Sequence, residues 1–160
     1  MDEILEIVTK DARRTAEEIA KLIGKTAAEV KRKIAEYEKD GTILQYKTVI
    51  NDAQREAGST VLALIEVSIT PQKDVGFDHI AERIYNFPEV KTCYLVSGGY
   101  DLLVIVEGKS IHTIADFVAS KLSPMENVRQ TSTHFLLKKY KEDGQVFKKN
   151  SRQKRLNISY

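Results

Sequence analysis

The residues best suited to hold a small molecule are two adjacent glycines and a nearby carboxylate in "LVSGGYDLLVIV", residues 95–106. Glycine permits positive φ and lets a ligand approach the backbone, which leaves the N–H groups of Gly98 and Gly99 free to meet a carboxylate. The Asp101 carboxylate can receive an ammonium group. Together the three residues form a clamp suited to an α-amino acid. Alternatively, the glycines only supply a hairpin turn and Asp101 accepts hydrogen bonds from its own loop.

The histidines and the single cysteine offer weaker chemistry. His112 and Asp116 lie one helical turn apart, which suits a metal or a base-orienting pair, but a solvent-facing hydrogen-bonded pair is far more common. Cys93 alternates with Lys91 and Leu95 in a predicted strand, where packing is expected rather than thiolate chemistry. Since no phosphate loop, dinucleotide fingerprint or metal-ligand cluster occurs, we expect no catalytic residues, no metal site and no cofactor, and hence no enzyme.

Helical signals dominate the first 50 residues. Thr15 with Glu18 and Thr26 with Glu29 are capping boxes, each followed by apolar residues at helical spacing. The predicted inward faces are Ile19, Leu22 and Ile23 in one helix, and Val30, Ile34 and Tyr37 in the next. Gly24-Lys25 leaves room only for a tight turn, so the two helices form a helix-turn-helix.

Two flanking segments complete this first domain. An apolar segment with Ile4, Leu5, Ile7 and Val8 predicts a preceding helix, and Gly41 is placed to end the last one. "TILQYKTVI", residues 42–50, has the composition of a short hairpin. The sequence therefore predicts a winged helix-turn-helix.

The rest of the chain predicts strands and helices in the order βαββαβ. Strands are expected over 60–69, 90–97, 100–107 and 128–137, and helices over 77–87 and from Ser110 onward, the first facing inward with Ile80, Ile84 and Phe87 and the second with Ile111, Ile114, Ala115, Val118 and Leu122. This order is typical of a ferredoxin-like plait, so the fold class is α+β. Strands this apolar also need a cover on the face away from the helices, which predicts a partner subunit.

Composition divides the chain further. We expect a winged helix-turn-helix domain over 1–50, a polar linker over 51–59, the plait over 60–140 and a basic tail over 141–160. In the tail, Asp143-Gly144 predicts a turn, after which "QVF" either pairs back onto the last strand or stays disordered with the residues that follow. No apolar run approaches the ~20 residues that cross a bilayer, and "MDEILEI" lacks the features of a secretory signal, so we expect a cytoplasmic protein without membrane contact.

A helix-turn-helix followed by this plait, with "LVSGGYDLLV" between the middle strands, resembles the leucine-responsive/asparagine regulator (Lrp/AsnC) family of transcription factors. "GKTAAEVKRKIAEYEKDGTI" and "TSTHFLLKKYK" carry the rest of the resemblance, which covers nearly the whole chain. It implies homodimers built by the plaits, often assembled into tetramers or octamers. It also implies double-stranded DNA as a partner, bound by paired winged helices.

The same resemblance implies control by a small effector, usually an amino acid, bound between dimers near the glycine-aspartate loop. The effector-binding residues that it implies here are Gly98, Gly99, Tyr100, Asp101 and Thr133. Family members commonly carry an acid after the first glycine, where this chain has Gly99. The identity of the ligand therefore does not carry over.

Recognition helices enter the major groove with their first turns. The candidate DNA-binding residues are accordingly Lys25, Thr26, Ala28, Glu29, Arg32 and Lys33. Arg32 suits a bidentate bond to guanine, whereas Lys25 and Lys33 suit phosphate. Residues 1–50 hold 10 basic and 10 acidic residues, so a monomer should bind DNA weakly and multiplicity must compensate.

These patterns favour a sequence-specific, DNA-binding transcriptional regulator with a ligand-sensing plait. The alternative is an amino-acid sensor or assembly protein whose helix-turn-helix is vestigial, a stable three-helix domain with a solvated, charge-mixed face. The neutral first half and the exposed acids Glu29 and Glu36 support this alternative.

Overall fold

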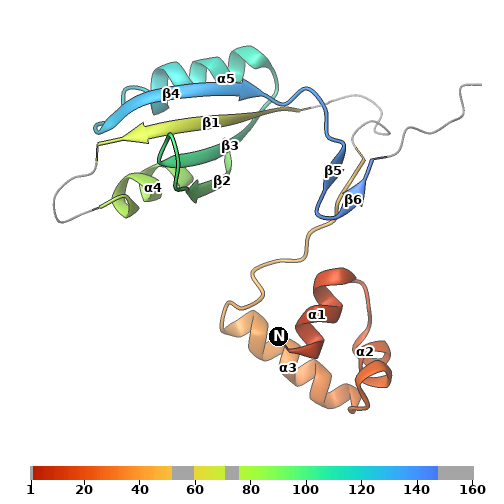
Figure 1. Cartoon of the computed structure of the whole chain (residues 1–160). Coiled ribbons are helices and arrows are strands. Elements are labelled where there is room, and N and C mark those ends of the chain that lie inside the picture. Colours follow the sequence, from red (N-terminus) through yellow and green to blue (C-terminus); the bar gives the residue numbers. More distant parts are fainter. Residues whose placement is uncertain (1, 52–59, 71–75, 148–160) are drawn as a thin grey trace, which may run out of the picture. The chain divides into compact units, whose positions relative to one another are not determined.

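The computed structural model describes residues 2–51, 60–70 and 76–147, and the chain divides into two compact units, Met1–Ile50 and Asn51–Tyr160 (Figure 1). The first unit holds helices and the second an antiparallel sheet with helices, which confirms the predicted fold class. Apart from Asn51, the predicted linker lies outside the described residues, as does the tail from residue 148. No helix in the described ranges combines the length and apolarity that crossing a membrane requires.

The N-terminal unit consists of α1 (Glu3–Lys10), α2 (Ala16–Ile23) and α3 (Ala27–Lys39). Both predicted capping boxes are confirmed. At the start of α2, the Thr15 hydroxyl accepts the backbone N–H of Glu18 and the Glu18 carboxylate accepts that of Thr15. Such reciprocal bonds satisfy donors that the first helical turn leaves without intrahelical partners, and they fix where each helix begins.

The core of this unit differs from the prediction at one position of α2. Ile19 is fully buried, but Leu22 is 58% exposed. Ala16, Ala20 and Ile23 complete the buried stripe with Ile19, and this stripe runs on the side of α2 away from Leu22. In α3, Val30 and Tyr37 are buried as predicted and Ile34 packs against the same core.

The expected wing is absent from the described structure of residues 42–50, which contain no strand. "TILQYKTVI" holds no Gly, Asn, Asp or Pro to turn a two-residue hairpin loop, so its β-rich composition has no turn to act on. The segment is instead tied to α3. The backbone N–H of Ile43 donates to the carbonyl of Tyr37 at 2.9 Å, and the Tyr46 hydroxyl donates to Glu38 at 2.9 Å.

The C-terminal unit is built on a four-stranded antiparallel sheet with the order β2-β3-β1-β4 (Figure 1). Its strands are β1 (Val61–Ile69), β2 (Val90–Leu95), β3 (Leu102–Gly108) and β4 (Val128–Phe135). Placing β1 and β3 at the centre is the ferredoxin-like arrangement that the βαββαβ order predicts. The register of β1 against β4 shifts between Ser68 and Ile69, next to the loop that joins β2 to β3.

One face of the sheet packs against α4 (Asp78–Tyr85), α5 (Ile111–Phe117) and the π-helical segment η2 (Val118–Leu122). The buried residues of this core come from alternate strand positions and from the helices: Ala63, Ile65, Val67, Leu102, Val104, Val106, Ile80, Ile84, Ile114, Phe117 and Leu122. The Ser110 hydroxyl accepts the backbone N–H of Thr113 and caps α5 as predicted.

The inward face of α5 is rotated from the predicted one. Ile111 is 53% exposed and Ala115 is also exposed, whereas Phe117, which the pattern did not select, is buried. Ile114 and Phe117, three residues apart, set the stripe. The π-helical turn then places Leu122 five residues after Phe117, so the buried side continues without Ala115.

Beyond β4, the strands β5 (Lys141–Glu142) and β6 (Gln145–Val146) form a small antiparallel hairpin. Asp143 and Gly144 make its turn with φ of 46° and 78°, which confirms the predicted turn. "QVF" therefore pairs with Lys141 and Glu142 and not with the last strand of the main sheet.

The sheet face opposite the helices carries apolar side chains that no described helix covers. Leu62 and Leu64 of β1 alternate with the buried residues, as do Leu103 and Ile105 of β3, and all four are half-buried. Tyr94, the Cα partner of Leu103, is 57% exposed. We call these five residues the open face.

Candidate functional site

The first candidate site is the exposed surface of α3, which begins directly after a tight turn. Gly24 adopts a left-handed conformation, with φ of 67°, and ends α2, and the Lys25 N–H donates to the carbonyl of Ala20 at 3.1 Å. Thr26 then caps α3. This geometry gives a helix-turn-helix in which the first turns of α3 face outward.

All six predicted DNA-binding residues lie on this turn and on the outer side of α3. Lys25, Thr26, Ala28, Glu29 and Arg32 are exposed, and Lys33 is half-buried. Thr26 and Glu29 bond to each other, with the Glu29 carboxylate 2.8 Å from the Thr26 N–H and 2.7 Å from its hydroxyl. These bonds lower the pKa of Glu29, so the side chain is a fixed, charged cap.

The cations of α3 differ in how far they are already paired. Lys33 lies 3.0 Å from Glu36 and 4.9 Å from the centroid of the Tyr37 ring, and the hydrogen bond to Glu36 raises its pKa. Lys31 bonds to Glu17 of α2 at 2.7 Å, a contact that the sequence pattern did not predict. Arg32 has no hydrogen bond or ion pair with any residue in the described ranges. It is therefore the cation of α3 most available for base recognition.

The second candidate site is the loop between β2 and β3, which contains Gly98, Gly99 and Tyr100. Both glycines are exposed, neither has a positive φ, and a Cβ built on either would meet no atom within 4 Å. Backbone conformation therefore does not require glycine here. What the missing side chains provide is open space beside the main chain.

Asp101 holds this loop to the neighbouring strand β1. Its carboxylate accepts the backbone N–H of Ile69 at 2.7 Å, its own N–H donates to the carbonyl of Val67 at 3.1 Å, and its carbonyl accepts the N–H of Val96 at 2.9 Å. The carboxylate bond goes to β1 and not to the loop itself, unlike in the structural alternative considered above. One carboxylate oxygen thus serves the fold at the register shift of β1.

Thr133 lies apart from the other four effector candidates within one chain. It is the Cα partner of Ile65 in the β1–β4 ladder, whereas Asp101 bonds at Ile69. Four residues of a strand span ~13 Å. Any site that contains both Thr133 and the loop therefore needs groups from more than one chain.

The remaining nucleophilic and histidine side chains have structural surroundings. Cys93 is half-buried against the sheet core, and burial raises the pKa of its thiol, which keeps it protonated near neutral pH. His134 lies 3.3 Å from Glu66 and 3.3 Å from Ser132. In the part of the chain that the structure describes, no three His, Cys, Asp or Glu residues are placed to hold a metal ion.

Comparisons with known proteins match both units. The family described as Lrp/AsnC ligand binding domain matches residues 62–146, and the family described as winged helix-turn-helix DNA-binding matches residues 3–43. The HTH-type transcriptional regulator YugG of Bacillus subtilis is 45% identical over 157 residues, which cover 98% of this chain and 95% of that protein.

Solved structures of two regulators share the fold. A transcriptional regulator of Neisseria meningitidis in complex with L-methionine superposes with a TM-score of 0.68 at 24% identity, over 88% of this chain and 89% of that one. The feast or famine regulatory protein of M. tuberculosis, complexed with L-methionine, superposes with a TM-score of 0.69 at 23% identity, over 89% and 92%.

Proposed function

We propose, because this chain belongs to the Lrp/AsnC family of transcriptional regulators, that it binds a specific DNA sequence through α3 and that an amino acid at the β2–β3 loop controls this binding. The observation that carries the DNA-binding half is the outward face of α3, where Arg32 stands exposed and unpaired among the described residues. In this proposal Arg32 reads a guanine edge, and Lys25 and Lys33 contact phosphate.

Dimerisation through the open face supports this function. Half-buried leucines on an uncovered sheet are favourable to bury against a second copy of the same face, by a two-fold axis. Two copies of α3 then bind one DNA molecule, and the effective concentration of the second offsets the weak attraction of a single neutral domain. Tetramers or octamers of such dimers extend the same arrangement.

In the effector half of the proposal, the N–H groups of Gly98 and Gly99 bind the carboxylate of an amino acid. Asp101 offers the oxygen not bonded to Ile69 to the ammonium group. Tyr100 and a Thr133 from a neighbouring chain close the site. The separation of Thr133 from Asp101 within one chain supports a site between subunits.

The central test of DNA binding is selection of genomic fragments by the purified protein. One enriched sequence motif is expected. If no motif were enriched, with or without amino acids, the vestigial helix-turn-helix would be the better account, and the pairing of Lys31 with Glu17 and of Lys33 with Glu36 would explain it.

Replacing Arg32 and Lys33 together by alanine should weaken binding to the selected motif. The lost bidentate contact costs about 1–3 kcal/mol, roughly 5- to 150-fold in the dissociation constant for each subunit. Fluorescence anisotropy at fixed salt measures the change. The control, Lys39→Ala with Lys109→Ala, removes the same charge from exposed positions away from the first turns of α3 and should change affinity much less.

Asp101→Asn separates the effector role of this side chain from its structural one. The amide oxygen can still accept the Ile69 N–H, so the fold should be retained, whereas the ammonium loses its anionic partner. Calorimetry against the twenty amino acids should show binding to the parent and none, or at least tenfold weaker binding, to the variant. Equal affinities would remove Asp101 from the proposed site.

A further inference from the structure

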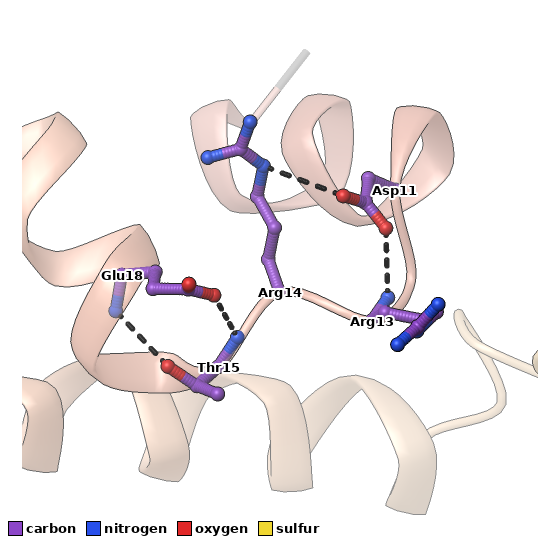
Figure 2. Close-up of polar contacts among 5 residues, drawn as sticks. All are labelled: Asp11, Arg13, Arg14, Thr15 and Glu18. Carbon is purple, nitrogen blue, oxygen red and sulfur yellow. Dashed lines mark hydrogen bonds and ion pairs between the residues drawn. The ribbon is translucent and has the colours of Figure 1, made fainter.

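The loop between α1 and α2 carries two consecutive arginines that the assignment of DNA contacts to α3 leaves out. Figure 2 shows Arg13 and Arg14 beside Asp11, with Thr15 and Glu18 following at the start of α2. The Asp11 carboxylate accepts the backbone N–H of Arg13 at 3.1 Å, and the N–H of Arg14 donates to the Asp11 carbonyl at 3.3 Å. These bonds fix the loop backbone, and with it the roots of both arginine side chains.

Both guanidinium groups keep donors for an outside partner. Arg14 approaches the Asp11 carboxylate only through Nε, at 3.8 Å, which leaves its two terminal nitrogens available. The Arg13 guanidinium has no hydrogen bond or ion pair with any described residue, and it points away from that of Arg14 (Figure 2). A guanidinium presents its donors in a fixed fork that matches phosphate oxygens.

The acids of the same region are already engaged. Glu18 caps the N–H of Thr15 at 2.9 Å, and Asp11 holds the loop. The side chains of Asp11, Arg13, Arg14 and Glu18 line an open hollow of about 330 Å³. The donors at its rim are therefore those of the two arginines.

The position of this loop relative to α3 is fixed within the N-terminal unit. Glu17, in the first turn of α2, bonds at 2.7 Å to Lys31, the neighbour of Arg32 on α3. In a helix-turn-helix bound to DNA, the second helix lies in the major groove while the first crosses the sugar-phosphate backbone. The loop that leads into α2 then faces the phosphates that border the groove.

We propose that Arg13 and Arg14 bind a backbone phosphate of the DNA whose groove α3 enters. This inference rests on the proposed function and adds to it a contact that positions the helix-turn-helix without reading sequence. Neutralising one phosphate per subunit releases counterions, so the contact must appear in the salt dependence of binding.

The test measures the dissociation constant of the full chain and of Arg13→Ala with Arg14→Ala between 50 and 200 mM salt, on the selected motif and on unrelated duplex DNA. The slope of log affinity against log salt should fall by about one per subunit. Affinity should fall by the same factor on both DNAs, with the preference for the motif unchanged. Arg13→Ala alone, which breaks no contact within the described residues, should show part of the same loss.

Lys39→Ala with Lys109→Ala again serves as the charge-matched control and should leave the slope close to that of the parent. An unchanged slope in the double arginine variant, measured while the parent binds DNA, would overturn this inference and leave the proposed function intact. A parent protein that binds no DNA at all would overturn both.

Discussion

Leu64→Asp is expected to convert the dimer into monomers. Leu64 lies at the centre of the open face, since its Cα partners are Ile105 on β3 and His134 on β4. A two-fold interface contains the substitution twice, and each carboxylate would have to leave water without a planned partner. A cost of about 3 kcal/mol or more raises the dimer dissociation constant at least ~100-fold, which sedimentation velocity detects.

Ile111→Asp is the matched control for this substitution. It also replaces a branched aliphatic side chain by aspartate, but at a 53% exposed position on the helix side of the sheet. The control should remain dimeric. If Leu64→Asp remained dimeric as well, the open face would not be the interface.

Loss of the dimer should also weaken DNA binding. Each α3 would then bind alone, without the effective concentration that the second subunit supplies. We expect at least ten- to a hundredfold weaker binding to a motif with two half-sites, and little change for a single half-site. This pair of measurements separates loss of multiplicity from damage to α3.

Ile19→Ala is expected to unfold the N-terminal unit while leaving the sheet domain folded. Ile19 is fully buried among the helices of this unit, and removing its side chain leaves a cavity that costs about 2–5 kcal/mol. A core of this size, in a unit of about 50 residues, rarely supplies more than about 3–5 kcal/mol. The residues packed around Ile65 form a separate cluster and should be unaffected.

Hydrogen exchange should therefore show α1, α2 and α3 unprotected in Ile19→Ala and the central strands still protected. Leu22→Ala, three residues along the same helix at a 58% exposed position, should cost less than about 1 kcal/mol. Loss of protection across the whole chain would show that the two cores do not unfold independently.

The parts of the fold that the sequence predicted are those set by neighbouring residues. Capping boxes require only a threonine and a glutamate three positions later, and both formed at Thr15 and Thr26. The Asp143-Gly144 turn is equally local. The strands of the sheet were predictable because alternation at Ala63, Ile65 and Val67 reflects one buried face.

Tertiary packing explains where the prediction was wrong. Leu22 and Ile111 have the right periodicity for a core, but the buried stripes of α2 and α5 are set by which neighbours they meet. For residues 42–50, β-rich composition indicated strands, although no turn residue was present to pair them.

The candidate sites show the same division. Placing the six DNA-binding candidates on one outward surface needed only the helical period, once Val30 and Tyr37 were assigned to the core. The partners of the charged groups were beyond reach, because Lys31 meets Glu17 through tertiary contact and Asp101 meets Ile69 across 32 residues. Whether these residues bind DNA or an effector stays a prediction.

The pairing of Lys31 and Lys33 with glutamates bears on how a regulator finds its operator. A genome offers millions of competing sites, and a protein held strongly by any phosphate backbone spends most of its time on them. Because these two lysines already have anionic neighbours, random DNA should retain few molecules and the unbound pool should stay large. Operator occupancy would then follow the effector concentration closely, since few molecules are lost to decoy sequence.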